Sequence, residues 1–167
     1  RQVIFKKKGF PQIPLGIVII YFSELQFFLM FIGGTIIFLG EFIRLKSIRF
    51  AGGSTRTTSV GAPELCSDGP YSHVRNPLYL GNIIIYIGIV IFSGGDLLFE
   101  ILVVTLIFFI IQYSLIISLE EEVLKKKFGR EYDIYSNSVP RLIPLILPWK
   151  GRTIINPRSW RKTLMIE

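Results

Sequence analysis

Long apolar runs alternate with short polar segments along the chain. Four runs stand out, at about residues 11–22, 25–43, 77–92 and 97–119. Their apolar residues follow one another continuously instead of alternating with polar ones, which favours membrane-spanning helices over the strands of a sheet. The pattern therefore predicts an all-α protein, a polytopic membrane helical bundle of about four transmembrane helices followed by a C-terminal segment.

Short turns separate the runs. Ser23 and Glu24 divide the first two, which predicts a tight antiparallel hairpin, and a Ser-Gly-Gly-Asp turn at 93–96 divides the last two. Pro77 fits the first turn of the third helix, where the missing N–H is not needed. The first and third runs are short, because a hydrocarbon core of about 30 Å takes about 20 helical residues.

Other segments carry packing and interface signals. Gly33, Gly34 and Gly40 in the second run predict the close approach of a neighbouring helix backbone. Residues 50–68 are rich in Gly, Ser and Thr and predict a flexible connection. Residues 145–167 mix apolar and basic residues around two tryptophans, which predicts a segment lying on the inner leaflet.

Composition agrees with a membrane protein. Half of the residues are hydrophobic and the mean hydropathy is +0.51. In a chain of 167 residues, several spans and their loops leave no room for a separate soluble domain, so residues 1–167 are expected to form a single domain. The single cysteine and the single histidine, Cys66 and His73, argue against a disulfide framework and against a catalytic metal.

The charges predict an orientation. All 19 basic residues fall before the first run, between the second and third, or after the fourth, and the two connections on the opposite side carry Glu24, Asp96 and Glu100 but no Lys or Arg. By the positive-inside rule, both termini, the loop 44–76 and the region after residue 120 face the cytoplasm of a cell (inner) membrane. Attraction to anionic headgroups explains the net charge of +7, so no nucleic-acid partner is expected.

Two polar blocks adjoin the predicted spans and carry the candidate chemistry. The first covers residues 69–82 and the second residues 120–144. Charged groups at the mouth of a membrane helix are energetically costly, which favours a functional site there.

The first block has two interpretations. As an interfacial anchor, Arg75 would bind a lipid phosphate, Asn76 would cap the third helix and Pro77 would begin it. A functional site would also account for Tyr79 and Gly81 on the first turns of that helix, because Gly81 leaves space for a ligand. The helix N-terminus also offers N–H groups to an anion.

The second block begins with three adjacent carboxylates. Glu120 and Glu121 are interpreted as functional carboxylates that can bind a cation or a hydroxyl group. Glu122 is instead interpreted as a solvated residue, paired with Lys125 and Lys126 at helical spacing.

The aromatic residues that follow the glutamates have two interpretations. Tyr132 and Tyr135 are spaced to share one helix face, where they either close a purine or lipid pocket or serve as interfacial aromatics. His73 is interpreted as a capping or interfacial residue, and Cys66 as chemically inert.

The two blocks together resemble the isoprenylcysteine carboxyl methyltransferase and phospholipid methyltransferase families. The family pattern pairs a Gly-Tyr element and an Arg-His/Asn-Pro-x-Tyr block with a Glu-Glu pair some forty residues later, then Leu, Phe-Gly and tyrosines. The matching residues are Gly69, Tyr71, Arg75-Asn76-Pro77-Leu78-Tyr79, Glu120-Glu121, Leu124, Phe128-Gly129, Tyr132 and Tyr135.

The resemblance implies an integral membrane enzyme that uses S-adenosylmethionine as cofactor. It implies a helical fold, with the cofactor at the cytoplasmic end of the bundle and a lipid or lipid-linked hydrophobic substrate arriving laterally from the membrane. The residues expected to bind the cofactor are Tyr71, Arg75, Asn76, Pro77, Tyr79, Leu80, Gly81, Glu120, Glu121 and Tyr132. Arg75 and Glu121 are the expected catalytic residues.

Two departures from the family leave the substrate open. Asn76 stands where the eukaryotic enzymes usually carry His, and no arginine directly precedes the Glu pair. A carboxylate acceptor would need a nearby cation, from Arg75, Arg44 or Arg141, and an amine acceptor would need a base such as Glu120 or Glu121. The alternatives are an NADPH-dependent membrane reductase of the sterol reductase type and a non-enzymatic lipid-binding bundle; the oligomeric state stays open.

Overall fold

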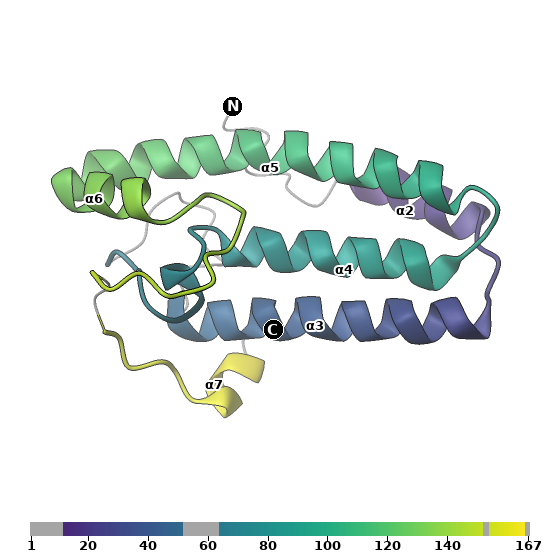
Figure 1. Cartoon of the computed structure of the whole chain (residues 1–167), viewed down its shortest axis with the longest axis horizontal. Helices are drawn as coiled ribbons and strands as arrows, with labels where there is room; N and C mark the ends of the chain where they lie inside the picture. The colour runs from purple at the N-terminus through teal and green to yellow at the C-terminus, as the bar shows by residue number, and fades with distance from the viewer. Residues whose placement is uncertain (1–11, 52–63, 152–153, 166–167) are drawn as a thin grey trace. The chain divides into compact units, whose positions relative to one another are not determined.

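A computed structural model of the chain describes residues 12–51, 64–151 and 154–165. Within these ranges every regular element is helical, so the predicted all-α class is confirmed. The elements, in chain order, are α2 (Gln12–Tyr21), α3 (Phe27–Ala51), the 3-10 helix η2 (Gly69–Ser72), α4 (Pro77–Ser93), α5 (Leu98–Phe128), α6 (Arg130–Ser138) and α7 (Trp160–Leu164) (Figure 1). The N-terminal basic segment and most of the loop predicted to be flexible lie outside the described residues.

Two of the helices continue beyond the apolar runs that predicted them. The second run ends at residue 43, but α3 continues through its basic residues to Ala51. The fourth run ends at residue 119, but α5 continues through the three glutamates and three lysines to Phe128. Good helix formers such as Glu, Lys and Arg propagate a helix into water, so hydropathy marks the span and not the end of the helix.

Helices α3 and α5 are long and apolar enough to cross a membrane, and α2 and α4 are shorter apolar helices. Large apolar side chains on α3, including those of Phe27, Phe31 and Phe38, are exposed to the surroundings. An exposed apolar surface of this extent is typical of contact with lipid. Length and composition therefore indicate a membrane protein.

The described residues form two compact units. The first unit holds the chain up to Glu41 together with Gly81–Ile116, and the second holds Phe42–Leu80 together with the chain from Ile117 onward. Helices α3, α4 and α5 each contribute residues to both units.

In the first unit, α3 and α4 approach each other at glycines. A Cβ atom on Gly33 would collide with the backbone of Gly88 and Phe92, and one on Gly40 would lie 2.9 Å from the carbonyl oxygen of Gly81. These contacts confirm the prediction for Gly33 and Gly40. The prediction is wrong for Gly34, because nothing lies within 4 Å of a Cβ atom built there.

The two predicted turns of the first unit lie beside each other. The N–H of Glu24 donates to the carbonyl oxygen of Ser93 at 2.9 Å, and Glu24 forms an isolated bridge with Gly94. Gly94 and Gly95 have positive φ angles of 62° and 94°, and a Cβ atom on either would strike the carbonyl oxygen of the facing turn. Glycine is therefore required at both positions.

In the second unit, α6 packs on a small apolar cluster. Its buried members are Leu65, Tyr132, Tyr135 and Val139, and Leu124, Phe128 and Trp149 pack against them. Trp149 therefore has a packing role within this unit, in addition to the interfacial role that the sequence predicts.

The C-terminal segment packs against the end of α3. The ring of Trp160 stacks on Phe42 with centroids 6.4 Å apart, and the guanidinium of Arg49 lies 4.7 Å from the centroid of the Trp160 ring. The N–H of Arg158 also donates to the carbonyl oxygen of Arg49 at 3.1 Å. These contacts belong entirely to the second unit.

Candidate functional site

The first polar block folds into a tight turn that leads into α4. The carboxylate of Asp68 accepts the Gly69 N–H at 2.7 Å and caps η2. Gly69 has a φ of 57° and faces the ring of Phe50, so a side chain does not fit there. Helix α4 then begins at Pro77, as predicted.

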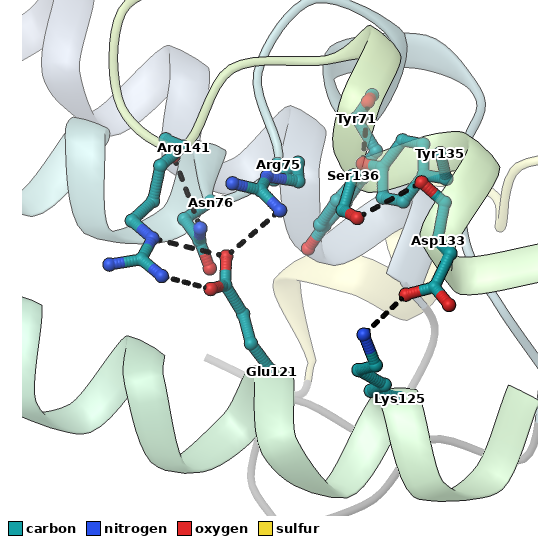
Figure 2. Close-up of polar contacts among 9 residues, drawn as sticks. All are labelled: Tyr71, Arg75, Asn76, Glu121, Lys125, Asp133, Tyr135, Ser136 and Arg141. Carbon is teal, nitrogen blue, oxygen red and sulfur yellow. Dashed lines mark hydrogen bonds and ion pairs between the residues drawn. The ribbon is translucent and has the colours of Figure 1, made fainter. Parts of the chain in front are cut away.

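A carboxylate between two guanidinium groups forms the centre of the candidate site. Nη1 of Arg75 lies 3.4 Å from Oε1 of Glu121, while Nη2 of Arg141 pairs with Oε2 and its Nε donates to Oε1 at 3.3 Å. Figure 2 shows both arginines pointing at the Glu121 carboxylate from different segments. The side chains of Arg75 and Glu121 are only 15% and 13% exposed. Two positive charges and one negative charge leave the cluster net positive, which favours an anionic ligand.

Backbone contacts bring Arg141 to this cluster. The N–H of Arg75 donates to the carbonyl oxygen of Pro140 at 2.9 Å, and Nδ2 of Asn76 donates to the carbonyl oxygen of Arg141 at 3.1 Å. The segment around Arg141 therefore lies against the turn that carries Arg75 and Asn76 (Figure 2). Through this hydrogen bond, Asn76 links the two polar blocks.

The second carboxylate of the pair has a different partner. The hydroxyl of Tyr79 donates to Oε1 of Glu120 at 2.7 Å. The structure thus brings Arg75 and Tyr79 of the first block to Glu121 and Glu120 of the second. Leu80 lines a neighbouring cavity, whereas Gly81 belongs to the first unit.

The two tyrosines of α6, Tyr132 and Tyr135, are buried. The hydroxyl of Tyr135 donates to the carbonyl oxygen of Tyr71 at 2.7 Å, so Tyr135 fastens α6 to the first block (Figure 2). The pKa of Tyr132 is raised to about 12, chiefly by burial and secondly by the Glu121 carboxylate, while the Arg75 guanidinium acts in the opposite direction. Burial also raises the pKa of Tyr71 well above its usual value. These phenols stay protonated at neutral pH and can donate hydrogen bonds.

The remaining charges of the second block lie on the surface. Nζ of Lys126 pairs with Glu122 at 3.2 Å, and Nζ of Lys125 pairs with Asp133 at 2.9 Å. The prediction that Glu122 is solvated and pairs with Lys126 is confirmed, whereas the predicted pairing with Lys125 is wrong, because Lys125 pairs with Asp133.

A cavity of about 410 Å³ lies beside the first block. Its polar lining comes from Lys46, Asp68 and His73, and Pro144 and Pro148 form part of its apolar wall. Sequence reasoning did not single out Lys46 or Asp68, because each stands alone among ordinary surface residues.

The single histidine and the single cysteine have structural environments. His73 is the C-cap residue of η2, and its Nδ1 hydrogen-bonds the carbonyl oxygen of Leu145 at 2.8 Å, so the predicted capping role is confirmed. A carbonyl can only accept, so Nδ1 carries the proton. Burial raises the pKa of Cys66 to about 12, which keeps it a thiol and agrees with an inert cysteine.

A family model described as phospholipid methyltransferase matches residues 28–131, more than half of the chain. The match includes the whole first polar block and the Glu120-Glu121 pair, and it ends before Arg141. No curated protein and no solved structure matches the chain.

Proposed function

The chain belongs to the phospholipid methyltransferase family, and from this premise we propose that it transfers a methyl group from S-adenosylmethionine to a lipid-borne or hydrophobic acceptor at the membrane. Family membership implies a methyltransferase of the membrane. The donor, the acceptor and the roles of individual residues are the proposal. The match does not favour the reductase or the non-enzymatic lipid-binding bundle.

The observation that carries the proposal is the cluster of Arg75, Glu121 and Arg141. Within the described part of the chain, the buried Nε of Arg75 has no hydrogen-bond partner. A buried charged donor without a partner is costly, so its retention favours a ligand that supplies an acceptor. The net positive cluster and this free donor both fit a carboxylate, such as the one that S-adenosylmethionine carries.

The surrounding residues fit the rest of the donor. We propose that Arg75 and Arg141 bind its carboxylate and that Glu120 accepts a hydrogen bond from its ammonium or a ribose hydroxyl. Tyr132 and Tyr71 would contribute aromatic surface and neutral hydroxyl donors. Glu121 is then a positioning residue, because it orients both guanidinium groups.

The proposed methyl transfer requires little further chemistry from the protein. When bound, the donor supplies a methyl group already activated on a sulfonium, so the protein contributes alignment and the exclusion of water. An amine acceptor must also lose a proton, for which a carboxylate of the Glu120–Glu121 pair is the candidate base. A carboxylate acceptor would need no base.

The cavity lined by Lys46, Asp68 and His73 is the proposed entry for the acceptor. Its volume of about 410 Å³ falls within the usual range of ligand pockets, about 300–1,000 Å³. Its mixture of charged and apolar walls suits an amphiphile.

The larger arrangement is part of the same proposal. We propose that α2, α3, α4 and α5 all span the membrane and that both units serve one methyltransferase domain. The basic residues gathered on one side of the spans support a cytoplasmic location for the second unit and for both termini of the chain.

A transfer assay with a radiolabelled methyl donor tests the proposal. The purified protein is incubated with S-adenosylmethionine labelled in its methyl group and with a total membrane lipid extract. We expect label in the organic phase, and at donor concentrations below saturation expect it to fall about tenfold or more with Arg75→Gln but not with Lys126→Gln. Label that never exceeds the no-enzyme control, with a protein that oxidises NADPH on the same extract, would favour a reductase instead.

A further inference from the structure

An irregular segment near the C-terminus presents apolar side chains outward. We call residues 143–148 the proline loop, since Pro144 and Pro148 flank its centre. The side chains of Ile143, Ile146 and Leu147 are 78%, 96% and 76% exposed. Three neighbouring apolar residues this exposed are unusual for a surface in water and indicate a contact with another apolar phase.

Hydrogen bonds anchor the chain on both sides of Ile146 and Leu147. The N–H of Leu145 donates to the carbonyl oxygen of His73 at 2.8 Å, and Nδ1 of His73 donates to the carbonyl oxygen of Leu145 at the same distance. Beyond the loop, the N–H of Trp149 donates to the carbonyl oxygen of Ser72 at 2.9 Å. Two anchor points therefore hold the loop, and Ile146 and Leu147 lie between them.

The residues next to the loop in the sequence are basic. Residues 139–166 contain six basic residues, namely Arg141, Lys150, Arg152, Arg158, Arg161 and Lys162, and no acidic residue. Apolar side chains bordered by basic ones match a lipid surface that carries anionic headgroups. A second copy of the chain would bring like charges together across a symmetric interface, which disfavours self-association at this loop.

The inner side of the same loop faces the cavity. Pro144 and Pro148 line it together with His73, the residue that anchors Leu145. The loop therefore has two sides, an outer one suited to lipid and an inner one that forms a cavity wall.

We propose that the proline loop is an interfacial wedge: Ile146 and Leu147 insert among the headgroups and upper acyl chains of an anionic leaflet. The wedge places the wall of the cavity at the lipid surface, so a membrane amphiphile can enter without crossing water. The contact with lipid does not depend on the chemistry of the proposed function, and it can be tested without measuring methyl transfer.

Depth-dependent fluorescence quenching tests the wedge. On a Cys66→Ser background, the single substitutions Ile146→Cys, Leu147→Cys and Asn137→Cys are labelled with a small environment-sensitive fluorophore in lipid nanodiscs. Asn137 is the matched control, an exposed polar residue on α6 of the same unit. Lipids spin-labelled near the headgroup quench probes within the interface, and aqueous iodide quenches probes in water.

The wedge predicts that spin-labelled lipid quenches the probes at 146 and 147 at least threefold more than the probe at 137, with iodide showing the reverse order. Replacing part of the neutral lipid with phosphatidylglycerol should increase the lipid quenching at 146, and Lys150→Glu should reduce that increase. Equal quenching of all three probes by iodide would overturn the proposal, as would no response to the anionic lipid. Protection of 146 from both quenchers, with crosslinking between copies at 146, would assign the loop to a protein interface instead.

Discussion

Glu121 and Glu122 are neighbours on α5, but they occupy very different environments. The Glu121 side chain is 13% exposed and lies between two guanidinium groups, whereas Glu122 is 54% exposed and pairs with Lys126 one turn along the helix. The two residues have the same chemistry and differ only in the face of the helix on which they lie. One step along an α-helix turns a side chain by about 100°, which is enough to move it from the guanidinium cluster to solvent.

The first unit repeats this contrast without charge. Gly33 packs against the backbone of α4, while Gly34 faces open space. In both pairs the two residues are of the same type, and their surroundings decide which of them makes structural contacts. A substitution at the inward member should therefore matter far more than the same substitution at its neighbour.

The largest effect is expected at Glu121. Glu121→Gln leaves two guanidinium groups without their shared counter-charge, and removing one partner of a buried ion pair costs about 3–5 kcal/mol. We expect the free energy of unfolding in detergent to fall by at least about 2 kcal/mol, since Arg141 retains access to solvent. Glu122→Gln is the matched control, and its loss should stay below about 0.5 kcal/mol, as for other exposed pairs. Equal losses at the two positions would remove the distinction.

The next effect concerns ligand affinity. Arg75→Gln removes a charge-assisted contact worth about 1.5–3 kcal/mol, so the dissociation constant of S-adenosylmethionine should rise about tenfold or more. Calorimetry on folded protein measures it, with Lys126→Gln as the control on the outward face. If Lys126→Gln weakens binding as much as Arg75→Gln does, the donor site lies elsewhere.

The glycine pair gives a similar test of packing. Gly33→Ala forces a methyl group into the α4 backbone, and overpacking of this kind costs about 1–3 kcal/mol. Gly34→Ala meets no atom and gains helix propensity, so its effect should be neutral or stabilising by up to about 1 kcal/mol. Thermal unfolding of the two variants in the same detergent compares them directly. A less stable Gly34→Ala protein would show that Gly34 also packs against a neighbour.

A smaller effect is expected at the other carboxylate of the site. Tyr79→Phe removes the hydroxyl that donates to Glu120, and a single hydrogen bond contributes about 0.5–1.5 kcal/mol. Donor affinity should fall about two- to tenfold, because Glu120 keeps its charge but loses its orientation. Tyr21→Phe, at an exposed tyrosine of the first unit, is the control. A loss as large as that of Arg75→Gln would mean that Tyr79 contacts the ligand itself.

Much of this arrangement could be predicted from the sequence. The continuous apolar runs predicted the helices, and the abrupt change to charged residues marked the two polar blocks. The spacing of Arg75, Tyr79 and the Glu pair indicated that they act together, because each block begins where a predicted span meets water. Sequence spacing does not fix which face of α5 meets the first block. The separate partners of the two glutamates could therefore not be predicted.

From the sequence, Arg141 was only one of three candidates for a cation near a carboxylate acceptor. Its approach to Glu121 depends on the chain reversing after α5, at Gly129 with a φ of 52°, and on the hydrogen bonds that dock the segment on Arg75 and Asn76. These contacts join residues that are distant in sequence and have no periodic pattern. The ends of α3 and α5 were missed for a different reason, because hydropathy does not register a helix that continues into water.

The central claim is that the cluster around Arg75 and Glu121 holds a methyl donor. Isothermal titration of the purified protein with S-adenosylmethionine, with its demethylated product and with NADPH tests this most directly. We predict saturable binding of the first two with one site per chain, and no heat of binding from NADPH. Saturable binding of NADPH with no response to either donor compound would contradict the account.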